Sequence, residues 1–250
     1  MTALRDRLHD RRRMTGTVLA LPGAALAELA AAPFDLVWID LEHGALDLPA
    51  MQDVAIGAQA AGAAVAVRIP RWDWDRLGAV LDAGVDGIVV PAAESAEQVA
   101  DVCARLRHPP VGVRGFGPRR AGRYARAAPA WEGSPPACIV QIETPDGVAG
   151  AGAIATVPGV DALVLGCSDL SLRLGQPLQL DSPQLVDAAA ALRATGAAFG
   201  VAGAGPPAAL ARLAGPDACL LICSTDIRLY AQAVDDVAAG LRSAYEVLHA

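Results

Sequence analysis

The side chains best suited to chemistry in this chain follow directly on short apolar runs. Asp40 and His43 follow FDLVWI, Arg68 stands near the end of AAVAVRI, Glu143 ends ACIVQIE, and Asp169 follows DALVLG. Carboxylates bind hard divalent cations, and imidazole transfers protons near neutral pH. Taken singly, an acidic residue after a strand could equally well be a helix N-cap. Asp169 could in this way cap a helix that begins at Leu170.

Glu143 and Asp169 stand about one strand–helix unit apart, so we expect them to be neighbours at one end of a sheet. Two carboxylates without a histidine or cysteine pair form an oxygen site of the kind that Mg²⁺ or Mn²⁺ prefers. The alternative is a pair of acids that are each neutralised by an arginine.

Asp40 and His43 offer a base together with a carboxylate that could orient it. The alternative is a structural histidine satisfied by a neighbouring acid. Arg68 offers a planar fork of donors for an oxyanion or a carboxylate, and its alternative is a salt bridge at the end of a strand.

The elements that must position these residues alternate between strands and helices. Eight continuous apolar runs are typical of parallel strands that are buried on both faces; they span residues 17–21, 34–40, 63–69, 86–91, 137–143, 161–166, 197–203 and 218–223. Helix-length Ala-rich stretches, beginning with 24–31, lie between most of them. The order predicts an α/β fold, a single (β/α)8 TIM barrel over residues 1–250, with a doubly wound open sheet as the alternative. Catalytic residues in such barrels lie at the carboxyl ends of the strands.

Two segments depart from this alternation. Residues 108–136 are too long and too rich in Gly, Pro and Arg for an ordinary connection, and such loops are usually functional. Their arginines could clamp an anionic substrate or form a salt-bridged face, with RNA binding a distant third possibility. Residues from about 227 to 248 read as one amphipathic helix.

Composition excludes several classes of protein. All 20 basic residues of the Lys+Arg count are arginines, which removes Schiff-base aldolases, pyridoxal-phosphate enzymes and P-loop nucleotidases, because each needs a lysine. A net charge of −7 argues against nucleic acid and anionic membranes as partners. No apolar run is long enough to span a membrane. The five scattered cysteines indicate reduced thiols and a cytoplasmic protein. The stretch after Arg11–Arg13 reads as a strand and a helix rather than a signal peptide.

The motifs FDLVWIDLEHG, VRIP, LDAGVDGIVVP, PPVGVRGFG, VQIET and LGCSDLS occur in this order. Together they resemble the HpcH/HpaI aldolase family, the class II pyruvate aldolases, over roughly residues 14–230. The resemblance implies a (β/α)8 barrel whose last helix is swapped between subunits, in a homohexamer built as a trimer of dimers. It also implies a divalent cation, Mg²⁺ or Mn²⁺ with Co²⁺ as a third option.

By resemblance, Glu143 and Asp169 are the metal ligands. Arg68 contacts the keto oxygen of bound pyruvate and stabilises its enolate. His43, paired with Asp40, serves in proton transfer.

The same resemblance makes Gln141 a residue that orients the metal site. It implies that the backbone amides around Gly166 and Ser168 bind the carboxylate of pyruvate. It also implies that Asp82 reaches the active site of the neighbouring subunit. One departure is Cys167, where the family usually has proline. We expect it to affect the choice of substrate more than the chemistry.

The implied function is reversible aldol cleavage of a 4-hydroxy-2-oxo acid to pyruvate and an aldehyde. An oxaloacetate decarboxylase or a citrate-synthase-like enzyme of a biosynthetic pathway would use the same site and is the alternative. A CoA-ester lyase fits the motifs less well. A non-catalytic binding protein on a decayed barrel is opposed by the intact set of Arg68, His43, Glu143 and Asp169.

Overall fold

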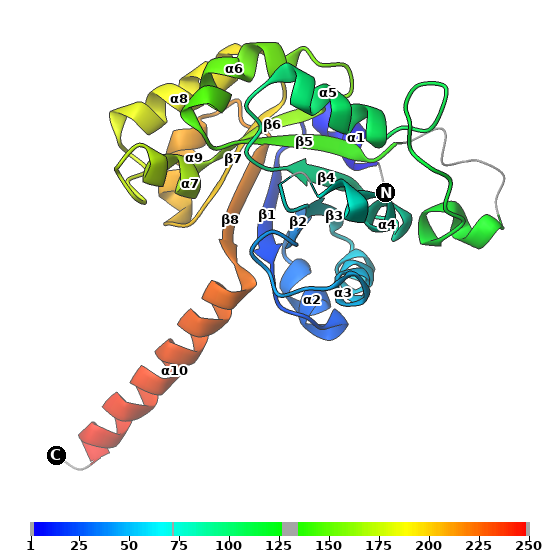
Figure 1. Ribbon diagram of the computed structural model, residues 1–250. Helices are drawn as coiled ribbons and strands as arrows, with labels where there is room; N and C mark the ends of the chain where they lie inside the picture. Colours follow the sequence, from blue (N-terminus) through cyan, green and yellow to red (C-terminus); the bar gives the residue numbers. More distant parts are fainter. Residues whose placement is uncertain (1–2, 72, 127–134, 249–250) are drawn as a thin grey trace.

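The eight predicted strands form one closed parallel barrel, with neighbours in the order β1 to β8 (Figure 1). The computed structural model describes residues 3–71, 73–126 and 135–248. The barrel is therefore the correct architecture, and the open sheet is not. The strands are β1 Met14–Leu19, β2 Leu36–Asp40, β3 Ala64–Arg68, β4 Gly87–Val90, β5 Ala137–Ile142, β6 Ala162–Gly166, β7 Phe199–Gly203 and β8 Leu220–Thr225.

Helices follow the strands around the outside of the barrel. The helix expected at 24–31 is confirmed with those bounds, and the C-terminal helix begins one residue before the expected 227. The described helices are α1 Leu4–His9, α2 Ala24–Ala31, α3 Leu48–Ala60, α4 Trp74–Asp82, α5 Ala96–Arg105, α6 Pro145–Ala155, α7 Cys167–Arg173, α8 Pro183–Ala194, α9 Pro207–Ala214 and α10 Asp226–Leu248, with a short 3-10 segment η1 at Arg120–Ala125.

Alternation along the strands decides which side chains enter the barrel. Leu36 and Trp38 of β2 belong to one buried cluster, and Val37 and Ile39 belong to another that includes residues of the helices. Because successive side chains of a strand point to opposite faces, Asp40 continues the interior row begun by Leu36 and Trp38. The same period of two carries the interior row of β5 from Ile139 to Gln141 and on to Glu143. The polar residues thus form the last interior layer at the carboxyl end.

The opposite end of the barrel is closed by α1, which the sequence reasoning did not predict. Leu4 and Leu8 are buried in the interior cluster. The buried carboxylate of Asp161 holds this helix by accepting hydrogen bonds from Arg5 Nε at 2.9 Å and by pairing with His9 Nε2 at 2.8 Å. Burial of the two leucines, together with the contacts that Arg5 and His9 make to the buried Asp161 carboxylate, explains why this short helix is part of the fold.

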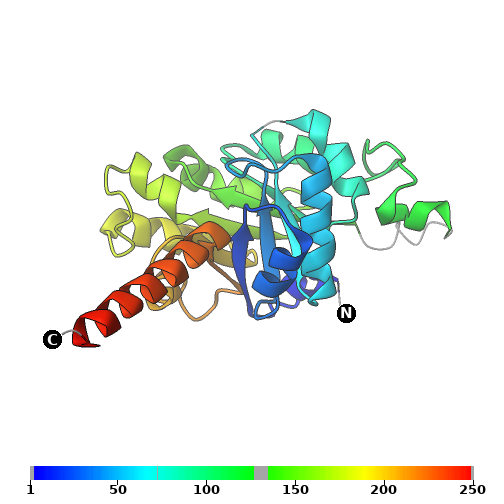
Figure 2. The ribbon, with the colours of Figure 1, turned by 90° about the horizontal axis from the view of Figure 1, so that it is seen from below.

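Helix α10 leaves the barrel and extends away from it, as Figures 1 and 2 show. Its first residue, Asp226, is buried and accepts hydrogen bonds from the backbone N–H groups of Ala20 and Leu21 at 3.0 Å. These bonds tie the end of β8 to the segment after β1. Beyond this first turn, large apolar side chains of α10 such as Val237 and Leu241 are exposed.

All five cysteines of the chain are free thiols in the structure. Cys103, Cys138, Cys167 and Cys219 are buried free thiols, and Cys223 is a half-buried free thiol. Burial raises the pKa of Cys167 to about 12, so this thiol stays protonated at neutral pH. Among the described residues, no helix combines the length and the apolar character that crossing a bilayer requires.

Candidate active site

A cavity of about 350 Å³ opens at the carboxyl end of the barrel. Seven of the nine residues singled out from the sequence line it, namely Asp40, His43, Arg68, Gln141, Gly166, Ser168 and Asp169. Trp38 and Ile222 of the interior cluster also line it, and so separate it from the apolar layers beneath. The expectation that the strand ends converge on one site is confirmed for these seven.

The guanidinium of Arg68 is held by Asp40. The two residues are register partners at the ends of β2 and β3. Arg68 Nε and Nη2 donate to the two carboxylate oxygens of Asp40 at 3.0 and 2.7 Å, and both side chains are largely buried. Burial acts to raise the pKa of Asp40, but hydrogen bonding to Arg68 and its charge outweigh burial and leave the pKa below its usual value. This bidentate pair fixes the plane of the guanidinium at the cavity.

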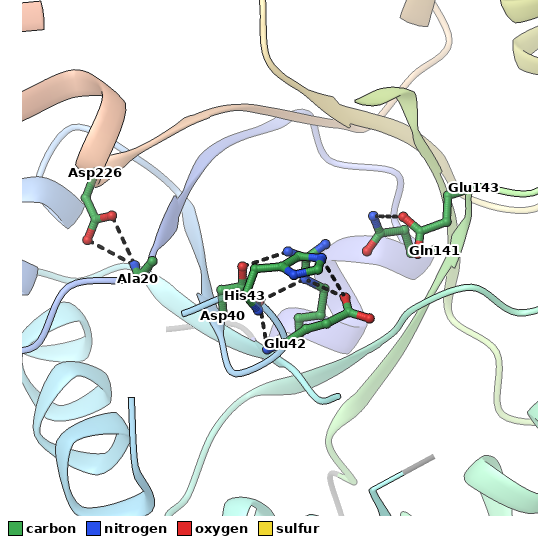
Figure 3. A network of polar contacts seen from close by, with 8 residues as sticks. Ala20, Asp40, Glu42, His43, Gln141, Glu143 and Asp226 are labelled. Atoms are coloured by element: carbon green, nitrogen blue, oxygen red, sulfur yellow. Dashed lines mark hydrogen bonds and ion pairs between the residues drawn. The ribbon is translucent and has the colours of Figure 1, made fainter. Parts of the chain in front are cut away.

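His43 has a different partner from the one expected. Asp40 Oδ1 accepts from the backbone N–H groups of Glu42 and His43, and its oxygens are otherwise bonded to Arg68 (Figure 3). The expected pairing of the Asp40 carboxylate with the His43 imidazole is therefore wrong. His43 Nε2 lies 3.9 Å from Glu42 Oε2 instead, and its side chain is 67% exposed. Asp40 orients Arg68, while the exposed imidazole of His43 lies at the mouth of the cavity beside Glu42.

Glu143 lies immediately after β5 in a buried, hydrogen-bonded position. Its Oε1 accepts from the backbone N–H of Ala92 at 2.9 Å, and its Oε2 accepts from Gln141 Nε2 at 2.6 Å (Figure 3). A β-carbon at Gly166 would lie 2.7 Å from Gln141 Nε2 and from Glu143 Oε2. Only glycine allows the end of β6 to approach this pair so closely. Burial first, and the negative charge of Asp169 second, raise the pKa of Glu143 to about 7.

Asp169 does not serve as a helix N-cap at Leu170. Helix α7 begins at Cys167 directly after β6, so Asp169 lies in its first turn and lines the cavity with Ser168. Cys167 is buried and packs in the outer cluster, close to Gly203. Its side chain does not line the cavity. The cysteine that stands where proline was expected therefore packs against the outside of the barrel and does not enter the described cavity wall.

The site residues fit a divalent cation. The carboxylates of Asp40, Glu42 and Glu143 lie around the guanidinium of Arg68, and the negative charge of Asp169 raises the pKa of both Glu42 and Glu143. A cation would relieve this repulsion. Gln141 Oε1 is buried without a hydrogen-bond partner in the described structure. Among the described residues no three His, Cys, Asp or Glu side chains cluster as a ready-made metal cage, so substrate and water would complete the coordination shell.

Asp82 lies outside this cavity in its own chain. It ends α4, and its Oδ1 accepts from Arg114 Nη2 at 3.1 Å. Arg120 Nη1 donates to the carbonyl oxygens of Ala83 and Gly84. None of the described residues of the segment 108–136 lines the cavity, and residues 127–134 lie outside the described structure. The described part of that segment therefore does not form an anion clamp over the site of its own chain. Arg114 and Arg120 bind the end of α4 instead.

Three residues around the cavity were missed by the sequence reasoning. Trp38 lies in the cavity wall with its indole Nε1 buried and unpaired in the described structure. Arg228 lines the cavity from the first turn of α10, and Asp226 secures that turn. The STD motif at 224–226, which directly follows the apolar run LLIC, was the available signal for Asp226, because it places polar residues at a strand end.

Comparison with known proteins identifies the family of this chain. Residues 18–205 match the family described as HpcH/HpaI aldolase/citrate lyase. A 2-dehydro-3,6-dideoxy-6-sulfogluconate aldolase of Pseudomonas putida is 36% identical over 76% of this chain and 78% of its own length. A 4-hydroxy-2-oxovalerate aldolase of Rhodococcus jostii strain RHA1 is 35% identical over 80% of this chain and 81% of its own length.

A crystal structure of an HpcH/HpaI aldolase/citrate lyase family protein from Burkholderia cenocepacia J2315 superposes with a TM-score of 0.87 at 27% identity. That match covers 96% of this chain and 98% of the other. Fold, motif order and sequence identity therefore agree, and the chain belongs to the HpcH/HpaI aldolase/citrate lyase family.

Proposed function

We propose that this chain is a class II pyruvate aldolase that reversibly cleaves a 4-hydroxy-2-oxo acid to pyruvate and an aldehyde. The observation that carries the proposal is one cavity lined by Asp169 and by a guanidinium that Asp40 fixes, with the buried carboxylate of Glu143 close enough to Asp169 for its pKa to be raised. A cation and a positioned donor are what an enolate of pyruvate requires. Membership of the family and the names of the aldolase relatives support the same reaction.

Glu143 and Asp169 would hold a divalent cation, Mg²⁺ or Mn²⁺ with Co²⁺ as a third option, and Gln141 orients Glu143 through its 2.6 Å hydrogen bond. When bound, the cation supplies Lewis acidity that stabilises negative charge on the keto oxygen. Arg68 donates hydrogen bonds toward the same oxygen as charge develops. His43, directly or through a water molecule, takes the hydroxyl proton of the aldol in cleavage and returns it in synthesis.

The backbone at Gly166 and Ser168 forms the cavity wall next to Asp169, and we assign the carboxylate of pyruvate to it. Asp82 is assigned to the site of a neighbouring subunit, in keeping with its place outside its own cavity. The single barrel domain is taken to cover residues 1–250. The five free thiols support a cytoplasmic location.

The test is a carbon–carbon bond assay. Pyruvate is incubated with a panel of short aldehydes and Mn²⁺ or Mg²⁺, and the 4-hydroxy-2-oxo acid products are identified by mass spectrometry. Cleavage of those products is then followed by coupling pyruvate formation to lactate dehydrogenase. We expect turnover in both directions that EDTA stops and Mn²⁺ restores. Metal-dependent decarboxylation of oxaloacetate without aldol product from any aldehyde would instead establish the alternative function.

A homo-oligomer is part of the proposal, and we infer that α10 docks on a second copy of the chain in a trimer of dimers. The exposed apolar residues of α10 recur at helical spacing on one face; they are Ile227, Tyr230, Val234, Val237, Leu241, Tyr245 and Leu248. The helix that carries this stripe extends away from the chain's own barrel (Figures 1 and 2). A helix of this length and pattern needs a partner surface.

The double variant Val237→Glu with Leu241→Glu tests the role of α10 in assembly. Two charges in the apolar stripe are expected to lower the molar mass measured by light scattering from that of a hexamer to that of smaller species. The matched control is Ala239→Glu with Ser243→Glu, which adds the same charge to the opposite face of the helix. A control that dissociates equally, or a stripe variant that stays hexameric, contradicts this assignment.

A further inference from the structure

The cavity has a second side that the proposed chemistry does not use. Asp40, Arg68 and Gln141 lie at the ends of β2, β3 and β5. Across the barrel, the ends of β7 and β8 and the start of α10 contribute Ala204 and Thr225 among others to the wall. Pyruvate occupies the first side in the proposed reaction, so the second side is where the chain of the acceptor aldehyde must lie.

A bulge in β8 turns polar side chains toward this second side. The pairing of β1 with β8 runs from Gly16↔Ile222 to Val18↔Thr225, so β8 contains one residue more than its partner. Ser224, within the bulge, has a φ of 67°, a value that L-residues other than glycine rarely adopt. Bulges and such backbone conformations commonly redirect side chains at functional sites. Here they bring Ser224 and Thr225 into the cavity wall.

Arg228, three residues after Thr225, is the charged residue on this side of the described cavity wall. Its backbone N–H donates to Thr225 Oγ1 at 3.2 Å, which fixes the first turn of α10. Its side chain lines the cavity. In the described parts of the chain, the structure records no hydrogen bond or ion pair of its guanidinium. Arg68, the other arginine of the cavity, already has its Nε and Nη2 paired with Asp40 and Glu42.

The distribution of charge selects the kind of group that Arg228 can bind. The reacting side of the cavity is lined by the carboxylates of Asp40 and Asp169, and those of Glu42 and Glu143 lie close to them, so an anionic tail would be repelled there. Within the described cavity wall, Arg228 is the basic residue on the opposite side, with the hydroxyls of Ser224 and Thr225 beside it. A guanidinium and hydroxyl donors together match the oxygens of a carboxylate, a sulfonate or a phosphate.

We propose that Arg228 is the specificity-determining residue for the acceptor, and that the preferred aldehydes carry an anionic oxygen group at the far end of a short carbon chain. The proposal rests on the proposed aldolase function. The aldehyde carbon then points toward Arg68, where it forms its bond to C3 of pyruvate and its oxygen gains a proton, while the anionic end lies against Arg228. A charge-assisted contact of this kind raises kcat/KM by about 10- to 100-fold over an uncharged analogue.

The experiment compares aldehydes with and without an anionic group at the far end. The pairs are 4-oxobutanoate with 4-oxobutanamide, and glyceraldehyde 3-phosphate with glyceraldehyde. For wild type we expect kcat/KM to favour the anionic member of at least one pair by about tenfold or more. Arg228→Gln is expected to lose that preference through a raised KM for the anionic aldehyde, and Arg228→Lys to retain part of it.

The matched control is Arg242→Gln, which removes the same charge from the same helix about 21 Å further along its axis and is expected to keep the preference. Exchange of the pyruvate methyl protons, measured on each preparation, must be unchanged in Arg242→Gln and still detectable in Arg228→Gln, which shows that the variant retains a working pyruvate site. If wild type exchanges the methyl protons but shows no preference for anionic aldehydes, or if the preference survives in Arg228→Gln, the role of Arg228 is overturned. The aldolase function is not affected by either result. Absence of exchange in wild type overturns the aldolase function and this inference with it.

Discussion

Replacing Glu143 by Gln is expected to abolish metal-dependent aldol cleavage. The substitution keeps the size of the side chain and its hydrogen bond from Ala92, but it removes a charge from the carboxylate pair with Asp169. A loss of about 4 kcal/mol of Lewis-acid stabilisation corresponds to a fall in kcat of about 10³-fold. Asp169→Asn is expected to behave in the same way. Turnover is measured by pyruvate formation at saturating Mn²⁺.

A second readout separates loss of the cation from loss of the fold. Mn²⁺ binding, followed by electron paramagnetic resonance without substrate, is expected to weaken by at least about tenfold in Glu143→Gln and Asp169→Asn. Asp146→Asn, an exposed acid in the first turn of α6, is the control and should bind Mn²⁺ as wild type does. Wild-type turnover and Mn²⁺ affinity in either cavity variant would remove that residue from the metal site.

Arg68→Lys is expected to lower kcat by about 10²- to 10³-fold even though the positive charge remains. Arg68 reaches both oxygens of Asp40 through a planar fork at 3.0 and 2.7 Å. An ammonium group cannot span both oxygens and still donate into the cavity in a fixed direction. The loss corresponds to about 2.7–4 kcal/mol, the effect of removing one donor to a developing oxyanion. Stopped-flow measurement of a single turnover isolates the chemical step.

The control for Arg68→Lys is Arg71→Lys, which changes the exposed partner of Glu94 just after the same strand. It should leave kcat within about twofold, as expected for an exposed ion pair. Arg68→Lys should also keep Mn²⁺ affinity close to wild type, because its donors act on the substrate and not on the cation. A near-normal kcat in Arg68→Lys would show that its fork is not needed where charge develops.

The barrel and most of the cavity could be predicted because both follow from short-range patterns. Continuous apolar runs indicated buried parallel strands, and the closed barrel confirms them. Polar residues that end such runs had to meet at one rim. The period of two then placed Asp40 and Gln141 in the interior row of their strands, above Trp38 and Ile139.

Side-chain pairing was harder to predict, because it depends on register and rotamer. Asp40 and His43 are close in sequence, which favoured pairing them, yet Asp40 is the register partner of Arg68 on the neighbouring strand. A guanidinium that donates to both carboxylate oxygens outcompetes an exposed imidazole. The extra residue in β8 that brings Arg228 to the cavity is equally invisible in the sequence, since a bulge leaves no mark in the apolar pattern of LLIC.

The most direct test of the central claim is hydrogen–deuterium exchange at the methyl group of pyruvate, read by mass spectrometry after quenching. It isolates enolate formation and needs no knowledge of the aldehyde. We predict exchange by the wild-type protein with Mn²⁺ or Mg²⁺ that stops with EDTA and is absent in Glu143→Gln. Methyl groups that stay protonated with every divalent cation, in a protein that binds Mn²⁺, would contradict a pyruvate enolate site in this barrel.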